Sequence, residues 1–320
     1  MGLVVGGNGR AQAPMVPRRQ RLTLLPGRAQ SHAMTLARPV DASARDENGA
    51  AHPLARLLAL GRPAVMGVLN VTPDSFSDGG RFLDPTSAIE QAERMVAGGA
   101  DIIDVGAEST RPYGSAVPVP IDEEIRRLTP VLPGAVALGV PVSIDTMKAK
   151  VAAWAIASGA AIVNDVWGLQ RDGDIARVVA EHGVPVIIMH NRHAADPSID
   201  IMADIAAFFS RSLEIAARAG IARESIVLDP GIGFGKTPEQ SLTAIARLSE
   251  LKSFGLPLLV GASRKRFIDK VSPASPDQRL GGSIAAHLLA AAGGAAIIRT
   301  HDVPETVQAL RIAAAIRGAQ

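Results

Sequence analysis

Eight short apolar runs, each followed by a segment with helical periodicity, constrain the fold of this chain more than any other feature. The runs are rich in β-branched residues and stop at polar ones, a pattern typical of strands followed by helices. Because they are apolar throughout and do not alternate, both faces of their sheet must be covered, as in a parallel sheet. The runs end as MGVLN, IIDVGAEST, VSID, AIVND, VIIMH, IVLD, LLVGAS and AIIRTH.

Eight strand and helix pairs within about 250 residues predict an α/β fold, the (β/α)8 TIM barrel, in preference to an open sheet. The hydrophobic content of 47% over 320 residues supplies enough apolar side chains for one large core. In such a barrel the carboxyl ends of all strands face one side, where active sites are found. The polar residues that end the eight runs are therefore expected to meet at one mouth.

The charge balance and the absence of cysteine exclude several classes of function. With 33 basic and 31 acidic residues the net charge is only +2, so no nucleic-acid partner is expected. Without cysteine there is no disulfide, no thiolate nucleophile and no zinc site of the cysteine type. No apolar run reaches the roughly 18 residues that a membrane span needs. We expect a soluble, cytoplasmic protein with no membrane partner.

The first part of the chain differs in character from the rest. Residues 1–51 are rich in Arg, Pro, Gly and Ala and show no strand or helix period, which predicts a mostly disordered extension ahead of a barrel spanning residues 52–320. The early arginines and the lack of early acids leave an organelle transit peptide as the alternative. Prolines that would interrupt its amphipathic helix argue against that alternative: Pro14, Pro17 and Pro26.

The stretch at residues 226–236, IVLDPGIGFGK, is the first candidate for a binding site. Asp229 ends an apolar run, and the glycines after it allow the backbone to approach a ligand closely. Neither the phosphate-binding pattern GxxxxGK[ST] nor the dinucleotide pattern GxGxxG is present, because Pro230 replaces one glycine and the glycine spacing is wrong. The alternative is that Asp229 only caps the following turn.

The periodic segments predict where several helices lie. A short helix at residues 54–60 precedes the first strand and is a candidate plug for the bottom of the barrel, and further helices are expected at 86–97, 200–219 and 238–253. The segment at 281–292 is rich in Ala and Gly with few charges, so we expect it to be buried, with a subunit interface as one explanation.

A helix beginning near Ile121 carries three acids in its first turn, Asp122, Glu123 and Glu124. Because the dipole of a helix favours acids there, we expect all three to be solvated and none to be catalytic.

Three loops after the predicted strands carry further candidates. The polar segment at residues 70–80 is longer than a connector needs, which indicates a functional loop. His190 and His193 could ligate a metal, but no third ligand follows at a recognisable spacing, so a loop role is favoured. The run GASRKR at residues 261–266 places cations at the start of a helix, which suits an anion.

Seven segments in one order carry a family resemblance. GVLNVTPDSFSDGG, GAESTRP, SIDT, VNDV, LDPGIGFGK, GASRKRFI and RTHDV, within residues 67–303, closely resemble the dihydropteroate synthases of the folate pathway. The resemblance implies condensation of a hydroxymethyl-dihydropterin pyrophosphate with 4-aminobenzoate, release of pyrophosphate, Mg²⁺ as the ion, and a homodimer. The chain departs from the commoner family pattern at Tyr113 and at residues 191–193.

The resemblance also implies a role for each matching residue. The pterin would contact Asp145, Asn164, Val166, Met189, Asp229, Phe234 and Lys265. The pyrophosphate would contact Asn70, Thr110, Arg299 and His301, with Asn70 as the protein ligand of Mg²⁺. The 4-aminobenzoate would contact Ser263, Arg111, Pro112 and Phe234. The residues expected to act in catalysis are Asp145, Lys265, Arg299 and His301.

A structural explanation remains open for some of these residues. Lys265 could be a surface charge, Asn164 a strand cap and His301 a core histidine, although such independent roles would not assemble the complete set.

By analogy with the family, we expect the leaving group to depart ahead of full attack. Asp145 would stabilise positive charge on the pterin methylene, while Mg²⁺ and Arg299 stabilise the departing oxyanion. The amine is already nucleophilic, so no general base is expected. Two other functions compete with this one: a pterin-binding methyltransferase that passes a methyl group to a corrinoid, and a barrel that binds pterins without turnover.

Overall fold

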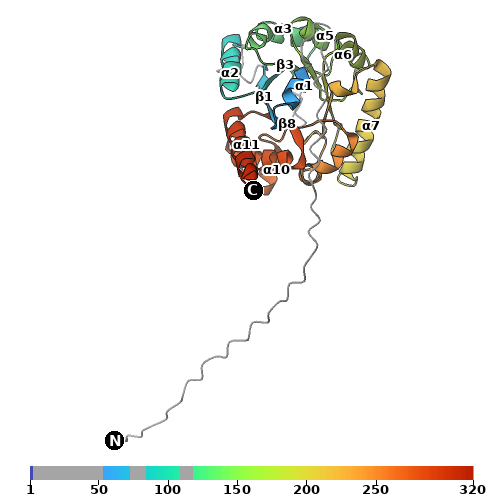
Figure 1. Ribbon diagram of the computed structural model, residues 1–320. Helices are drawn as coiled ribbons and strands as arrows, with labels where there is room; N and C mark the ends of the chain where they lie inside the picture. Colours follow the sequence, from blue (N-terminus) through green and yellow to red (C-terminus); the bar gives the residue numbers. More distant parts are fainter. Residues whose placement is uncertain (3–52, 73–83, 109–117, 320) are drawn as a thin grey trace. The chain divides into compact units, whose positions relative to one another are not determined.

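Parallel strands closed into a barrel form the centre of the molecule (Figure 1). The computed structural model describes residues 1–2, 53–72, 84–108 and 118–319. In this part of the chain eight strands follow one another around the barrel in sequence order, and β8 pairs with β1 to close it. The predicted (β/α)8 barrel is therefore confirmed. Nearly all of the predicted disordered extension, residues 3–51, lies outside the described residues.

Each strand coincides with one of the apolar runs, and every pairing around the barrel is parallel. The strands are β1 (Ala64–Asn70), β2 (Ile102–Gly106), β3 (Val142–Asp145), β4 (Ile162–Asp165), β5 (Val186–Met189), β6 (Ile226–Asp229), β7 (Leu258–Val260) and β8 (Ala295–Thr300).

Helices surround the strands on the outside (Figure 1). They are α2 (Pro85–Ala97), α3 (Ile121–Leu128), α4 (Leu132–Val136), α5 (Ala149–Ala157), α6 (Ile175–His182), α7 (Ile201–Ala219), α8 (Pro238–Ala246), α9 (Arg266–Val271), α10 (Leu280–Gly293) and α11 (Val303–Gly318). Short 3₁₀ segments lie at η1 (Arg223–Ser225), η2 (Leu248–Phe254) and η3 (Pro276–Gln278). The single helix predicted for 238–253 is α8 followed by η2, because Arg247 leaves the helical conformation at φ −103° and ψ 17°.

The strand side chains form two separate apolar layers because successive residues of a strand point to opposite sides. One set, which includes Val65, Ile103 and Ile144, packs outward against the helices. The other set fills the inside of the barrel: Ala64, Met66, Ile102, Ile162, Ile187, Val227, Leu259 and Ile297. We call this second set the bottom layer.

The helix α1 (Pro53–Leu58) closes the bottom layer. Its Leu54 and Leu57 are buried against the bottom layer, and Figure 1 shows α1 over the centre of the barrel. The predicted plug is confirmed.

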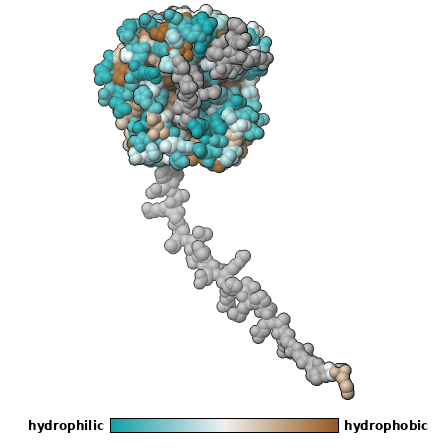
Figure 2. Space-filling view, turned by 180° about the vertical axis from the view of Figure 1, so that it is seen from behind, coloured by the Kyte–Doolittle hydropathy of each residue, from teal (hydrophilic) through white to brown (hydrophobic). Residues whose placement is uncertain are grey.

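The Ala- and Gly-rich segment is α10, and the prediction that it is buried was only half right. Ser283, Ala286, His287 and Ala290 are buried, but Leu289 on the opposite face is 64% exposed. Among the described helices, none has both the length and the apolar character that crossing a membrane requires. Hydrophilic side chains cover most of the face seen in Figure 2, with apolar ones scattered between them.

Candidate active site

On β2, β4, β6 and β8 the polar residues of the site face inward like the bottom layer and lie two residues further along the strand. Two residues after Ile102 comes Asp104, and in the same way Asn164 comes after Ile162, Asp229 after Val227 and Arg299 after Ile297. Because inward positions recur every second residue, these polar side chains form the next layer, at the carboxyl ends of the strands. We call this set, together with Asp145 at the end of β3, the mouth layer.

Arg299 joins two carboxylates of the mouth layer. Its Nε lies 2.7 Å from Asp104 Oδ2 and its Nη2 lies 2.9 Å from Asp145 Oδ2. The side chains of Asp104 and Arg299 are 0% and 18% exposed, so solvent hardly screens these ion pairs. Burial raises the pKa of Asp145, the Asp104 carboxylate adds to that rise, and Arg299 opposes it.

Asp104 was not among the predicted site residues. Its signal was present in the sequence, because it is an acid inside the apolar run IIDVG. An acid in a strand that is buried on both faces needs a partner or a function. The partner, Arg299, is 195 residues away in the chain.

Several buried oxygen atoms of the mouth layer, and that of Ser143 on β3, have no hydrogen-bond partner among the described residues. Asn164 donates from Nδ2 to Asp104 Oδ2 at 3.1 Å, so its amide is oriented with Oδ1 left over. The unpaired oxygens are Asp104 Oδ1, Asp145 Oδ1, Asn164 Oδ1 and Ser143 Oγ. Because an unpaired buried polar atom costs about 1–3 kcal/mol, these oxygens indicate a site for a ligand that supplies N–H groups.

Asp229 is both a turn cap and a member of the mouth layer. Its Oδ1 accepts from the backbone N–H of Gly231 at 2.7 Å, and the residue is only 4% exposed. Burial raises the pKa of Asp229, and the nearby Lys265 opposes that rise. The two roles considered from the sequence are therefore compatible, because the cap uses one oxygen of the carboxylate.

Lys265 and Phe234 lie together beside Asp229. The Nζ of Lys265 donates to the carbonyl of Ile232 and lies 4.4 Å from the centroid of the Phe234 ring, a cation–π contact. Burial lowers the pKa of Lys265 to about 7, although Asp229 opposes the shift. Lys265 is thus more than a surface charge. The apolar residues predicted to line the same site, Val166 and Met189, are both buried.

The residues at the ends of β7 and β8 pair with each other. Ser263 Oγ lies 3.0 Å from His301 Nδ1 and accepts from the backbone N–H of His301 at 3.2 Å. Two residues predicted to bind different substrates, 4-aminobenzoate and pyrophosphate, are therefore in contact.

Asn70 is half-buried at the end of β1, beside Gly106 of β2. The other predicted contacts of pyrophosphate and 4-aminobenzoate, Thr110, Arg111 and Pro112, lie outside the described residues, as does most of the loop at 70–80. Within the described ranges, no group of three or more His, Asp or Glu side chains could hold a metal ion.

The prediction that Glu124 is solvated was wrong. Glu124 is 0% exposed, accepts from Thr146 Oγ1 at 2.7 Å and pairs with Lys148. Lys148 also pairs with Glu108, which follows β2. The helix dipole accounts for an acid at this position, but only tertiary structure brings the lysine to it. Glu123 pairs with Arg126 and Arg127 on the helix surface.

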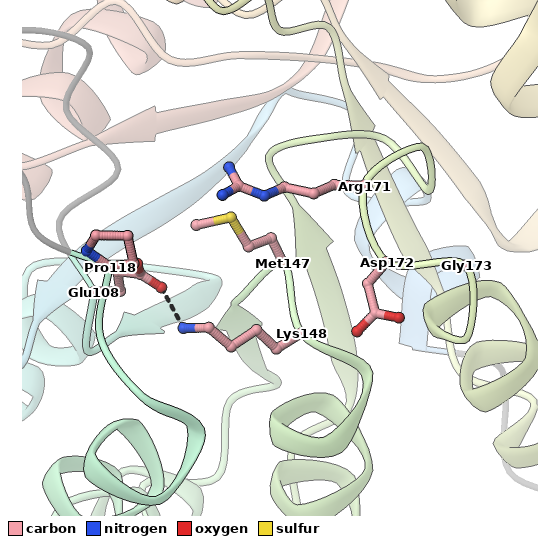
Figure 3. A pocket seen from close by; sticks show the side chains of 7 residues that line it. All are labelled: Glu108, Pro118, Met147, Lys148, Arg171, Asp172 and Gly173. Atoms are coloured by element: carbon pink, nitrogen blue, oxygen red, sulfur yellow. Dashed lines mark hydrogen bonds and ion pairs between the residues drawn. The ribbon is translucent and has the colours of Figure 1, made fainter.

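A cavity of about 360 Å³ lies beside the mouth layer, after strands β2, β3 and β4 (Figure 3). The ion pair between Lys148 and Glu108 forms part of its wall. None of its lining residues belongs to the mouth layer: Glu108, Pro118, Met147, Lys148, Arg171, Asp172 and Gly173. It is a neighbouring space, distinct from the positions predicted to bind the pterin.

The two histidines considered as metal ligands have other partners. His190 is 0% exposed, and its ring lies between Lys236 and Asp204. The ring of His193 contacts that of Trp167, with the centroids 4.5 Å apart and the planes tilted by 40°. Neither Lys236 nor Asp204 was singled out from the sequence.

Comparison with known proteins gives concordant matches over most of the barrel. A family model described as pterin binding enzyme matches residues 66–301. The chain is 44% identical to a dihydropteroate synthase of Synechocystis over 265 residues, which are 80% of this chain and 90% of that protein. It is 46% identical over 260 residues to a probable bifunctional folylpolyglutamate synthase/dihydropteroate synthase of Haloferax volcanii, covering 79% of this chain and 30% of that protein.

A solved structure is similar in fold as well as in sequence. It is a dihydropteroate synthase from Clostridium difficile, crystallised in the presence of pteroic acid. The TM-score is 0.76 at 49% identity, and the match covers 80% of this chain and 97% of that one.

Proposed function

The chain belongs to the dihydropteroate synthase family of pterin-binding enzymes, and we propose that its mouth layer binds and activates the substrates of that family. The reaction is the condensation of 6-hydroxymethyl-7,8-dihydropterin pyrophosphate with 4-aminobenzoate to give 7,8-dihydropteroate and pyrophosphate.

The observation that carries this assignment of the site is the set of unpaired buried oxygens. A pterin presents a guanidine-like edge of N–H donors, and Asp104, Asp145 and Asn164 each hold one buried oxygen with no partner in the described part of the chain. Asp229 has a second carboxylate oxygen beyond the one that accepts from Gly231. A carboxylate that pairs with two N–H groups is oriented and strengthened by charge. The site therefore matches the donors of a pterin in kind.

Lys265 and Phe234 complete the pterin site in this proposal. The ammonium group of Lys265 can donate to the pterin carbonyl, and the Phe234 ring offers apolar contact to the aromatic substrates. The contact between the two side chains brings the Lys265 ammonium group and the Phe234 ring next to each other. Met189 and Val166 supply further apolar surface.

Arg299 has donors left for the leaving group. A guanidinium carries five N–H donors, and the carboxylates of Asp104 and Asp145 accept from two of its nitrogens. The remaining N–H groups can donate to a diphosphate, together with His301, which extends from the same strand end. Negative charge grows on the leaving oxygen in the transition state, so these contacts strengthen there.

We also propose Mg²⁺ as the ion, with Asn70 as its protein ligand. Mg²⁺ often keeps several waters and binds substrate phosphates with only one or two protein oxygens. The amide oxygen of Asn70 at the end of β1 fits such a role, since β1 is paired with β8, which carries Arg299. When bound, the ion would neutralise charge on the diphosphate.

A homodimer is proposed on the apolar side chains that α10 and α11 expose. Leu289, Ile312 and Ile316 are 64%, 58% and 62% exposed, and α10 and α11 pack against each other. Sedimentation of the wild type and of Leu289→Glu tests this: a dimer that persists in the variant contradicts this interface. The cytoplasmic location stays a prediction, to be checked by cell fractionation.

The test of the proposed function is turnover by the purified protein. Incubation with the pterin pyrophosphate, Mg²⁺ and labelled 4-aminobenzoate should form labelled dihydropteroate. Chelation of Mg²⁺ should stop turnover, and added Mg²⁺ should restore it. Pterin binding without turnover would indicate the silent barrel, and methyl transfer to a corrinoid would indicate the methyltransferase.

A further inference from the structure

Lys236 is a buried lysine that the proposed chemistry does not use. It is 3% exposed, in the loop between β6 and α8, and the ring of His190, at the end of β5, is 0% exposed. Burying a lysine is costly unless its three N–H donors find acceptors. Burial lowers the pKa of Lys236 well below its ordinary value and the charge of Lys265 adds to that shift, although Asp229 and Asp204 oppose it.

The three donors of Lys236 have three acceptors. Its Nζ lies 2.9 Å from the carbonyl of Gly231, 3.1 Å from the carbonyl of Phe234 and 2.6 Å from Nδ1 of His190. Asp204 Oδ2 lies 3.0 Å from Nε2 of His190 and accepts from it, so a neutral ring carries its proton on Nε2 and presents Nδ1 to Lys236 as an acceptor. Burial and the charge of Lys236 lower the pKa of His190 to about 3, consistent with a neutral ring.

The two loops joined by this lysine are packed backbone against backbone. Gly231 and Gly235 have φ of 63° and 54°, and a Cβ at either would collide with the chain at His190 or Arg192. The loop after β6 can therefore lie against the loop after β5 only with glycine at both positions. Between these glycines lies Phe234, whose carbonyl Lys236 holds and whose ring contacts Lys265.

We propose that Lys236, with neutral His190 as its third acceptor, is a positioning residue that sets the Phe234 ring beside Lys265 for the aromatic substrate. This inference rests on the proposed function, in which Phe234 contacts 4-aminobenzoate and the pterin. Lys236 itself does not touch the substrate. It acts through the carbonyls of Gly231 and Phe234, and Asp204 acts on it through the tautomer of His190.

The first experiment compares Lys236→Met with Lys236→Gln and with Lys252→Met, a control at an exposed lysine. Met keeps the length and loses every donor, whereas Gln keeps two donors without charge. We expect the KM for 4-aminobenzoate to rise about 10-fold or more in Lys236→Met with kcat changed less than about 3-fold, because the loss is one of binding. Lys236→Gln should lie between wild type and Lys236→Met, and the control should match wild type.

The second experiment asks whether the effect passes through Phe234. In a Phe234→Ala background, Lys236→Met should raise the KM by less than about 2-fold, because residues that act as a unit are not additive. A purely structural lysine would lower the melting temperature without changing the KM of the folded enzyme, or would raise the KM by the same factor in both backgrounds. Either result overturns the inference.

Two further outcomes must be distinguished from failure of this inference: a variant that does not fold, and a wild type without the proposed activity. If Lys236→Met does not fold, Lys236→Gln and Asp204→Asn decide, and an unchanged KM in either soluble variant overturns the inference. If the wild type forms no dihydropteroate, the proposed function fails whatever the variants do. If it does, only the KM values of the variants bear on Lys236.

Discussion

The bottom layer and the mouth layer both face the inside of the barrel, two residues apart on β2, β4, β6 and β8, yet they differ in polarity, charge and hydrogen bonding. The bottom layer is apolar, covered by α1 and free of charge. The mouth layer holds buried charges, raised pKa values and unpaired oxygens. The bottom layer therefore contributes to the stability of the fold. The buried charges and unpaired oxygens of the mouth layer reduce stability but are available to bind a ligand, as is common at active sites.

The largest effect should follow loss of the cation that holds the mouth layer together. Arg299→Ala leaves Asp104 and Asp145 as buried, unpaired carboxylates, and breaking a buried pair in this way costs about 3–5 kcal/mol. Turnover should fall as well. The destabilisation should shrink as the pH falls, because protonated carboxyl groups need no counter-charge.

Denaturant unfolding at several pH values measures this effect, with the exposed Arg94→Ala as control. A loss of stability independent of pH would mean that Arg299 supports the barrel by packing alone. Titration with pterin ligands that carry and lack the diphosphate then separates the two roles of Arg299. Equal losses of affinity for both ligands would exclude a contact with the leaving group.

A cavity in the bottom layer should lower stability without changing activity, whereas loss of Arg299 should lower both. Met66→Ala removes a fully buried side chain and should cost about 2–5 kcal/mol of unfolding free energy. The kcat/KM of the folded protein should stay that of wild type, because the bottom layer does not reach the substrates. Val271→Ala, at a position that is 67% exposed and outside the proposed dimer interface, is the control for stability. A large drop in kcat/KM for Met66→Ala would show that the two layers are mechanically coupled.

Removing one charge of the mouth layer should change binding more than stability. Asp229→Asn keeps the shape but replaces one acceptor oxygen by a donor, so pterin affinity should fall by about 1.5–3 kcal/mol, or about 10- to 150-fold. The burial that raises the pKa of Asp229 also makes its charge costly, so unfolding free energy should stay within about 1 kcal/mol of wild type. Unchanged pterin affinity in calorimetry would reduce Asp229 to the cap of the Gly231 turn.

A pH dependence should separate stability from activity, because the two are expected to move in opposite directions. The folded-state pKa of Lys265 is lowered to about 7 from its ordinary 10.5, so the lysine loses its charge as the pH rises through about 7. The kcat/KM should fall over this range, because it reports the free enzyme. Stability should rise from about pH 7 to 10.5, since the unfolded chain there binds a proton that the folded one does not.

Lys265→Met should remove the rise of stability with pH, which thermal unfolding can follow. If the wild type and Lys265→Met show parallel stability curves, the charge of Lys265 is not suppressed by burial. A kcat/KM of the wild type that stays flat through pH 7 would mean that the neutral amine serves the substrate equally well.

The order of strands, the barrel and most of its mouth could be predicted from the sequence because their signals are local. An apolar run that ends in a polar residue predicts both the strand and the position where the strand ends, as at Asp145 and Asp229. The helix caps are equally local: Asp200 accepts from the N–H groups of Met202 and Ala203 at the start of α7. The inward or outward direction of each strand residue then follows from its period of two.

Partners that are distant in sequence were decided only by the tertiary structure. Asp104 looked like one polar residue in an apolar run until barrel closure brought Arg299, from the last strand, within 2.7 Å. Glu124 carries the signature of a solvated helix start, yet Lys148 and Thr146 bury it. Lys236 and His190 meet across 46 residues of chain. The sequence by itself determined which residues end the strands, because that depends on neighbours along the chain. Their charge partners, exposure and pKa depend on neighbours in space.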